Sequence, residues 1–238
     1  MDASERKDAE RIAENVASVR ERMERAAIAS GRDPSSVRLV AVTKTVPAPL
    51  VAAAVAAGVT MVGENYIQEA KAKIEALSGL PVSWHFIGHL QTNKARFAAR
   101  LFDAVHTLDS FRLALELSKR LEAENRDMTV LIEVNTGGEA TKSGVAPEAA
   151  ADLAAAVAAL PRLHLSGLMT MPPFCENPED ARPHFACLRR LAEKIAARRI
   201  ENLRMDELSM GMSHDFEAAI KEGATLIRVG TDIFGSRA

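Results

Sequence analysis

The sequence predicts a closed (β/α)8 barrel of the TIM type, formed by a single domain over residues 1–238. Eight short apolar runs alternate with stretches of helical periodicity, and this alternation is typical of a parallel sheet. A length of 238 residues fits one barrel of this kind. No linker rich in Pro or Ser and no shift in composition divides the chain. An open, doubly wound sheet is the alternative architecture.

The first half of the chain begins with an amphipathic helix over residues 5–30. Its apolar positions recur at helical spacing: Ile12, Val16, Val19 and Met23. Four strands are then predicted, at Arg38–Lys44, Met61–Gly63, Trp84–Gly88 and Ala104–Thr107. Helices separate them, from Pro47 to Gly58, over residues 66–77 and around 93–100.

The second half supplies the other four strands, at Thr129–Val134, Leu163–Met169, Glu207–Met210 and Leu226–Val229. The helices between them are marked by apolar residues at helical spacing, around Leu113–Leu121, 147–159, Phe185–Ile195 and Phe216–Ile220. The last strand leaves no room for a following helix. We therefore expect the helix of residues 5–30 to complete the outer ring.

Composition excludes several classes of protein. The net charge is −2 with interspersed signs, whereas a nucleic-acid-binding protein needs a clustered basic face. The longest apolar run, around residues 51–62, is shorter than the roughly 18 residues of a membrane span, and the polar start lacks the apolar core of a signal peptide. Cys175 and Cys187 form neither a CxxC pair nor a metal-type spacing. We expect a reduced, cytoplasmic protein with no metal, membrane or nucleic-acid partner.

Lys44 is the residue on which the functional prediction depends. It follows the apolar strand Leu39–Val42, and active residues of such barrels lie at the carboxyl ends of strands. A dry site favours the neutral, nucleophilic form of an amine. The sequence therefore predicts that Lys44 forms a Schiff base with a carbonyl ligand.

Small-residue turns follow strands seven and eight, where such barrels commonly bind phosphate. Glycine lets backbone N–H groups approach an anion, and a helix N-terminus adds a favourable dipole. A phosphate near Lys44 is therefore predicted to be held by Ser209, Gly211, Gly230 and Thr231. Alternatively, these glycines only end strands and Ser213 only caps a helix.

A Schiff-base lysine beside a phosphate cradle indicates an aldehyde phosphate, of which pyridoxal 5'-phosphate (PLP) is the common case. Arg228 is the single charge in the strand Leu226–Val229 and shares a face with Gly230. A buried arginine needs a partner. Arg228 therefore either faces the ring nitrogen of the cofactor or forms a salt bridge with a core acid such as Glu133 or Glu207.

Several motifs together resemble the pyridoxal phosphate homeostasis proteins, whose barrel is similar to the N-terminal domain of alanine racemase. The resemblance runs from about residue 38 to Arg237 and rests on Val42–Thr45, Gly63–Glu69, Trp84–Lys94, Lys142–Gly144, Gly167–Met171, Leu208–Ser213 and Arg228–Thr231. It implies that Lys44 carries PLP as a Schiff base and that Asn65 lies beside the ring. It further implies that Ser209, Gly230 and Thr231 hold the phosphate and that Arg228 lies by the ring nitrogen.

Two positions depart from the family pattern. Val46 stands where many relatives have lysine, and Asp232 stands where a small apolar residue is usual. Asp232 would place an extra carboxylate near the phosphate. Among the remaining polar residues, we interpret His85 as a hydrogen-bonded structural histidine. Lys142 is either a second anion contact or a solvated loop lysine.

The predicted function is intracellular PLP homeostasis without strong catalysis. Arginine stays protonated, so Arg228 would donate a proton poorly to the ring nitrogen. Alanine racemase uses a tyrosine of its partner subunit as the opposite acid/base, and the sole tyrosine here is Tyr66. A monomer that passes PLP transiently to PLP-dependent apo-enzymes is expected. The alternatives are a slow amino-acid racemase with Lys44 as base and a Schiff-base aldolase acting on a sugar phosphate.

Overall fold

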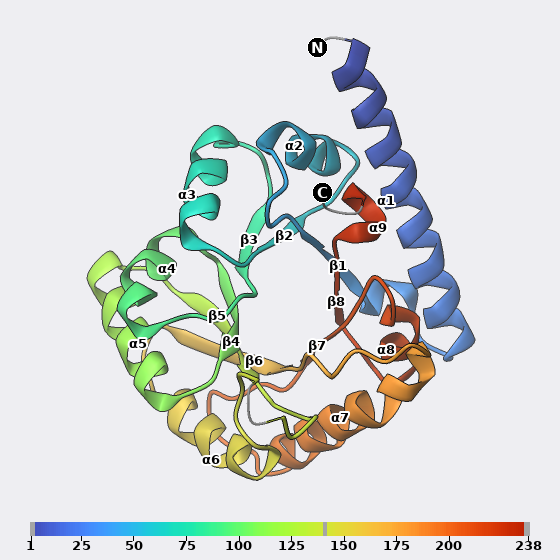
Figure 1. Cartoon of the computed structure of the whole chain (residues 1–238). Helices are drawn as coiled ribbons and strands as arrows, with labels where there is room; N and C mark the ends of the chain where they lie inside the picture. The colour runs from blue at the N-terminus through green and yellow to red at the C-terminus, as the bar shows by residue number, and fades with distance from the viewer. Residues whose placement is uncertain (1–2, 140–141, 236–238) are drawn as a thin grey trace.

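The computed structural model of the protein describes residues 3–139 and 142–235 and contains a closed barrel of eight strands (Figure 1). The strands pair in parallel and in chain order, and β8 closes the barrel on β1 from Arg38–Leu226 to Ala41–Val229. The predicted fold class is thereby confirmed, and the open sheet is excluded. The domain boundaries 1–238 remain a prediction, because residues 1–2, 140–141 and 236–238, including Arg237, lie outside the described residues.

The strands match the predicted apolar runs with small differences at their ends. They are β1 (Arg38–Val42), β2 (Met61–Glu64), β3 (Ser83–Phe86), β4 (Ala104–Leu108), β5 (Met128–Glu133), β6 (Leu163–Met169), β7 (Glu207–Met212) and β8 (Leu226–Val229). β7 continues two residues beyond the predicted end at Met210, whereas β1 and β3 end two residues before their predicted ends, at Val42 and Phe86. Below, "mouth" denotes the end of the barrel where the strands finish, and "base" the end where they start.

Helices surround the strands (Figure 1). They are α1 (Ala3–Ala29), α2 (Ala48–Ala56), α3 (Ile67–Ala76), α4 (Ala95–Leu101), α5 (Phe111–Glu124), α6 (Pro147–Ala158), α7 (Arg182–Ala196), α8 (Phe216–Lys221) and α9 (Thr231–Phe234). Short 3-10 turns occur at Pro34–Ser36, Thr92–Lys94 and Pro178–Ala181. Within the described part of the chain, no helix has the length and apolar character needed to cross a membrane.

Helix α1 completes the outer ring, as predicted, and runs beside α2, α8 and α9 (Figure 1). Its apolar stripe is buried against the barrel, with Ile12, Val16 and Val19 at most 1% exposed. The prediction that no helix follows the last strand was wrong. One helical turn, α9, follows β8 and ends at Gly235, whose φ of 93° leaves the helical region. Asn15 of α1 donates a hydrogen bond to the carbonyl oxygen of Ile233 in α9 at 2.9 Å.

The interior of the barrel is unlike the layer between strands and helices. Strand alternation sends Leu39 and Ala41 outward into the large aliphatic core, whereas Val40 joins a small interior cluster with Leu131, Met169 and Leu226. The other buried interior side chains described below are polar or charged. Buried polar groups need hydrogen-bond or ion-pair partners. The contacts of these side chains therefore indicate where a functional site lies in the barrel.

Candidate functional site

Lys44 lies in the turn that leaves β1 at the mouth. Thr43, just before it, is fully buried, whereas Lys44 is half-buried. Thr45 has a φ of 62°, which is uncommon for a β-branched residue and marks a turn held in place by its surroundings. Its backbone N–H donates to Glu69 Oε2 of α3 at 2.7 Å. The position of Lys44 is thus fixed by contacts on both sides.

A buried ion pair supports this turn. Lys73 Nζ of α3 lies 2.7 Å from Glu64 Oε1 of β2, and their side chains are 9% and 0% exposed. Lys73 also donates to the carbonyl oxygen of Thr43, and the Thr43 hydroxyl donates to Glu64 at 2.7 Å. Burial raises the pKa of Glu64, although Lys73 and Thr43 act in the opposite direction. We did not predict this pair, because Lys73 has the spacing of a surface lysine on an amphipathic helix.

Arg228 of β8 lies inside the barrel and is 4% exposed. Its guanidinium donates to Ser209 Oγ at 2.7 Å and to the carbonyl oxygen of Thr170 at 2.9 Å. Among the described residues, no carboxylate lies within ion-pair distance of it, so the alternative of a salt bridge to Glu133 or Glu207 was wrong. Burial lowers the pKa of Arg228 to about 10, which still leaves a cation at neutral pH.

Ser209 faces Arg228 because β7 carries a bulge. The pairing with β8 moves from Ser209–Leu226 to Met212–Arg228, so β7 uses one residue more than β8 over the same stretch. Gly211 has a φ of 91°, and a Cβ there would lie 2.6 Å from the Cβ of Ala219 in α8. Bulges often re-aim side chains beside functional sites. The bulge explains this glycine, and the phosphate contacts of Ser209 and Gly211 remain predictions.

The turn after β8 carries Gly230 and Thr231. The carbonyl oxygen of Gly230 accepts hydrogen bonds from the N–H groups of Ile233 and Phe234, and Thr231 is exposed. A phosphate contact of either residue remains a prediction. Asp232 faces away from this turn toward α1, where Arg22 contacts its carboxylate at 2.5 Å. The extra carboxylate is therefore paired with a cation.

Asn65 and Glu133 border one cavity of about 110 Å³ at the mouth. Asn65 Oδ1 and Glu133 Oε2 are both buried, and neither accepts a hydrogen bond from a described residue. Gly88 lets the backbone of Asn65 come close, because a Cβ there would lie 2.5 Å from its carbonyl oxygen. Burial raises the pKa of Glu133 to about 7, the charge of Asp109 adds to this effect, and Arg228 opposes it. These two acceptors would suit a ligand that carries hydrogen-bond donors.

Two further predictions concern other polar residues. His85 is buried and contacts His106 at 2.9 Å, which confirms that it is a hydrogen-bonded structural histidine. Lys142 borders the cavity and pairs with Glu139 at 2.6 Å, and its role as an anion contact remains a prediction. In the described ranges, no group of three or more His, Cys, Asp or Glu residues could hold a metal ion.

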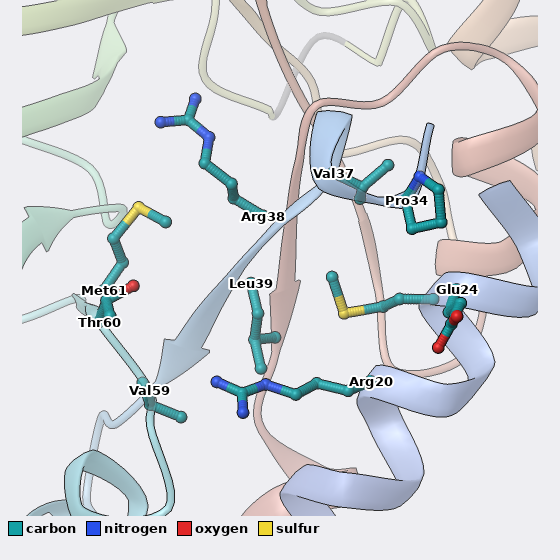
Figure 2. A pocket seen from close by; sticks show the side chains of 10 residues that line it. Arg20, Glu24, Pro34, Val37, Arg38, Leu39, Val59, Thr60 and Met61 are labelled. Atoms are coloured by element: carbon teal, nitrogen blue, oxygen red, sulfur yellow. The ribbon is translucent and has the colours of Figure 1, made fainter. Parts of the chain in front are cut away.

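Another hollow lies away from Lys44. A pocket of about 350 Å³ lies between α1 and the starts of β1 and β2. Figure 2 shows Arg20 and Glu24 on its helical side and Val59 and Met61 opposite. The start of a strand is at the base of the barrel, so this pocket is separate from the residues at the mouth. It shares none of its lining with the predicted cofactor site.

Comparison with known proteins assigns the family. Residues 8–238 match the family model of the alanine racemase N-terminal domain. The chain is 49% identical over 228 residues to the pyridoxal phosphate homeostasis protein of Pseudomonas aeruginosa, covering 95% of this chain and 96% of the relative. It is 45% identical over 224 residues to that of Aquifex aeolicus, covering 94% and 97%.

A solved structure of PipY from Synechococcus elongatus with PLP bound has the same fold, with a TM-score of 0.82 and 36% identity. The similarity covers 94% of this chain and 100% of that one. Both the family match and these relatives span nearly all of the sequence. The chain therefore belongs to the alanine racemase N-terminal domain family and, within it, to the pyridoxal phosphate homeostasis proteins.

Proposed function

We propose that this protein binds PLP at the mouth of its barrel, holds it as a Schiff base on Lys44 and serves PLP homeostasis without strong catalysis of its own. The observation that carries the proposal is Arg228, a buried cation with no carboxylate partner in the described part of the chain. Such a cation suits an anionic or electron-rich ligand. Relatives named for PLP homeostasis and the PLP-bound PipY support it.

The residues present fit the chemistry of this cofactor. PLP supplies an aldehyde and an electron-withdrawing ring, and Lys44 supplies the amine that would hold the aldehyde. Arg228 uses only two of its five N–H groups in the described contacts and can offer another to a pyridine nitrogen. The unpaired Asn65 Oδ1 marks where a donor is missing. The phosphate would be held by Ser209, Gly211, Gly230 and Thr231.

The same residues favour a carrier over a strong enzyme. Arg228 keeps its proton, so it would leave the ring nitrogen of PLP unprotonated. An unprotonated ring is a weak electron sink. Tyr66, the sole tyrosine, is 54% exposed at the start of α3. A slow amino-acid racemase with Lys44 as base is the second candidate, and membership of the alanine racemase domain family favours it.

The finer parts of the proposal concern location and partners. We place the protein in the cytoplasm as a monomer that passes PLP transiently to PLP-dependent apo-enzymes. Free thiols at Cys175 and Cys187 suit a reducing compartment. Size-exclusion chromatography with light scattering tests the monomer directly.

The substitution Lys44→Ala is expected to abolish the visible absorbance that appears when PLP is added to the wild type, because no amine remains to form the Schiff base. Lys71→Ala, in an exposed lysine of α3, is the matched control and should behave as the wild type. Absorption spectra of the three proteins with added PLP make the comparison. A wild type that ignores PLP, or an unchanged band in Lys44→Ala, would contradict the proposal.

Isotope exchange separates the two candidate functions. Amino acids incubated with the PLP-loaded protein in deuterated water should keep their α-protons, because Tyr66, the sole tyrosine, is 54% exposed and Arg228 leaves the ring a weak electron sink. Exchange at enzyme-like rates that disappears in Lys44→Ala would replace the carrier by the racemase.

A further inference from the structure

A line of hydrogen-bonded side chains crosses the interior of the barrel from Arg228 toward the base. The line begins where Arg228 donates to Ser209 Oγ at 2.7 Å. The same hydroxyl lies 2.9 Å from Nδ1 of His106, a β4 residue that is fully buried. Ser209 and His106 are 103 positions apart in sequence, so only closure of the barrel brings them together.

The line continues from His106 to a carboxylate at the base. His106 Nε2 lies 2.9 Å from His85 Nδ1, and His85 Nε2 lies 3.1 Å from the hydroxyl of Ser83. Ser83 in turn donates to Asp103 Oδ2 at 3.3 Å. A guanidinium, which can only donate, therefore stands at one end, and a carboxylate, which can only accept, stands at the other.

The two ends fix the direction of every hydrogen bond between them. Ser209 accepts from Arg228, and the remaining acceptor near its own proton is Nδ1 of His106. His106 then carries its proton on Nε2 and donates to His85, which likewise donates from Nε2 to Ser83. In the reverse direction, the buried Ser209 hydroxyl would have no acceptor among the described residues, which is costly.

We propose that His106 and His85 are positioning residues that connect Arg228 to Asp103 through one directed hydrogen-bond chain and thereby hold the guanidinium toward the mouth. The chain stabilises the buried cation without placing a carboxylate beside it. Arg228 thus keeps its orientation and its free N–H groups for a ligand. The role toward the ligand rests on the proposed PLP site, whereas the chain itself is a property of the protein alone.

The charges around the chain are consistent with neutral histidines. Burial lowers the pKa of His85 to about 4, with Asp103 opposing and Arg38 adding to this effect. Burial also holds the pKa of His106 well below its usual value, and the positive charges of Arg228 and Arg38 act in the same direction. Both rings therefore act at neutral pH as one donor and one acceptor each.

The base end of the chain is open to water. A cavity of about 380 Å³ is lined there by Arg38, Ser83, His85 and Asp103, among others. Figure 2 shows the Arg38 side chain directed away from α1, and Glu207 binds its guanidinium. Asp103 is half-exposed and also contacts Arg126 at 3.3 Å. The charge of Asp103 can therefore be removed by substitution without disturbing the buried part of the hydrogen-bond chain.

Nitrogen-15 NMR of the histidine rings in the cofactor-free protein tests the chain without reference to PLP. At neutral pH, both His85 and His106 should be neutral, with the proton on Nε2 and a bare Nδ1. Spectra of His85→Gln and His106→Asn assign the signals by their loss. A proton on Nδ1 of either ring, or a charged ring, overturns the proposal.

PLP binding tests the role toward the mouth. His106→Leu should weaken PLP binding about tenfold, because Ser209 loses its acceptor and no longer orients Arg228. His106→Asn should recover part of the loss, since its amide oxygen can accept from Ser209. Equal losses in both variants would mean that the effect is only structural and would overturn the positioning role.

Asp103→Asn extends the test to the far end of the chain. It should weaken PLP binding in the same direction by a smaller factor, although the residue lies at the base. Asp127→Asn is the matched control, because Asp127 also directly precedes a strand, is equally exposed and contacts an arginine at the same distance. Identical binding in the Asp103 and Asp127 variants overturns the coupling. A wild type that binds no PLP refutes the proposed function. The NMR result then tests by itself whether the hydrogen-bond chain from Arg228 to Asp103 exists.

Discussion

Lys73→Met is expected to destabilise the protein by about 3 to 5 kcal/mol, because it leaves the carboxyl group of Glu64 buried without its cation. Glu64 is fully buried, and one of its oxygens already lacks a hydrogen-bond partner in the described residues. The Thr43 carbonyl oxygen also loses the donor that holds the turn before Lys44. Urea denaturation measures the free energy of unfolding, and PLP titration should show weaker binding at the loosened turn.

Lys71→Met is the matched control for this prediction, because Lys71 lies on the same helix, is 62% exposed and pairs with Glu75 at the long distance of 3.8 Å. It should change stability by no more than about 0.5 kcal/mol. The double substitution Glu64→Gln with Lys73→Met should recover much of the loss by removing the unpaired charge. Similar stabilities for the Lys73 and Lys71 variants would contradict the role assigned to the buried pair.

Glu133→Gln is expected to stabilise the protein above neutral pH, on the order of 3 kcal/mol. The pKa of Glu133 is raised from 4.5 to about 7 in the folded protein, mainly by burial. Between these values the folded state binds more protons than the unfolded state, so wild-type stability falls as pH rises. The loss is complete above about pH 7 and absent below about pH 4.5. Glutamine does not ionise, so the Glu133→Gln variant should lack this decrease of stability with rising pH.

Urea denaturation at a series of pH values measures the effect. The curves of wild type and Glu133→Gln should separate progressively through this pH window. Glu148→Gln, in an exposed residue of α6, should follow the wild type throughout. Parallel curves for wild type and Glu133→Gln would show that the pKa of Glu133 is not raised in the folded protein.

The architecture could be predicted because local patterns carry it. Each strand is an apolar run between helical periodicities, and the predicted bounds of β8 agree with those observed. The extension of β7 could not be predicted, because a glycine such as Gly211 typically ends a strand. Gly211 instead lies in a bulge, with a φ of 91°. The single helical turn α9 was not predicted, because four residues are too few to show a helical periodicity.

The partners of these side chains could not be predicted, because residues that are far apart in sequence come together only in the folded barrel. Arg22 and Asp232 are 210 positions apart, and Ser209 and His106 are 103 apart. Arg228 was recognised as an isolated charge in an apolar strand, yet its partners proved to be a hydroxyl and a carbonyl oxygen rather than an acid. The sequence thus singled out Arg228 and Ser209 and left open what they contact, and it did not single out His106.

The central claim is that Lys44 holds PLP through a Schiff base. Borohydride reduction of the PLP-loaded protein, followed by proteolysis and mass spectrometry, tests it most directly by converting the imine to a stable secondary amine. We expect the phosphopyridoxyl group on the peptide that contains Lys44. A label confined to another lysine such as Lys73 or Lys142, or no label at all, would contradict the claim.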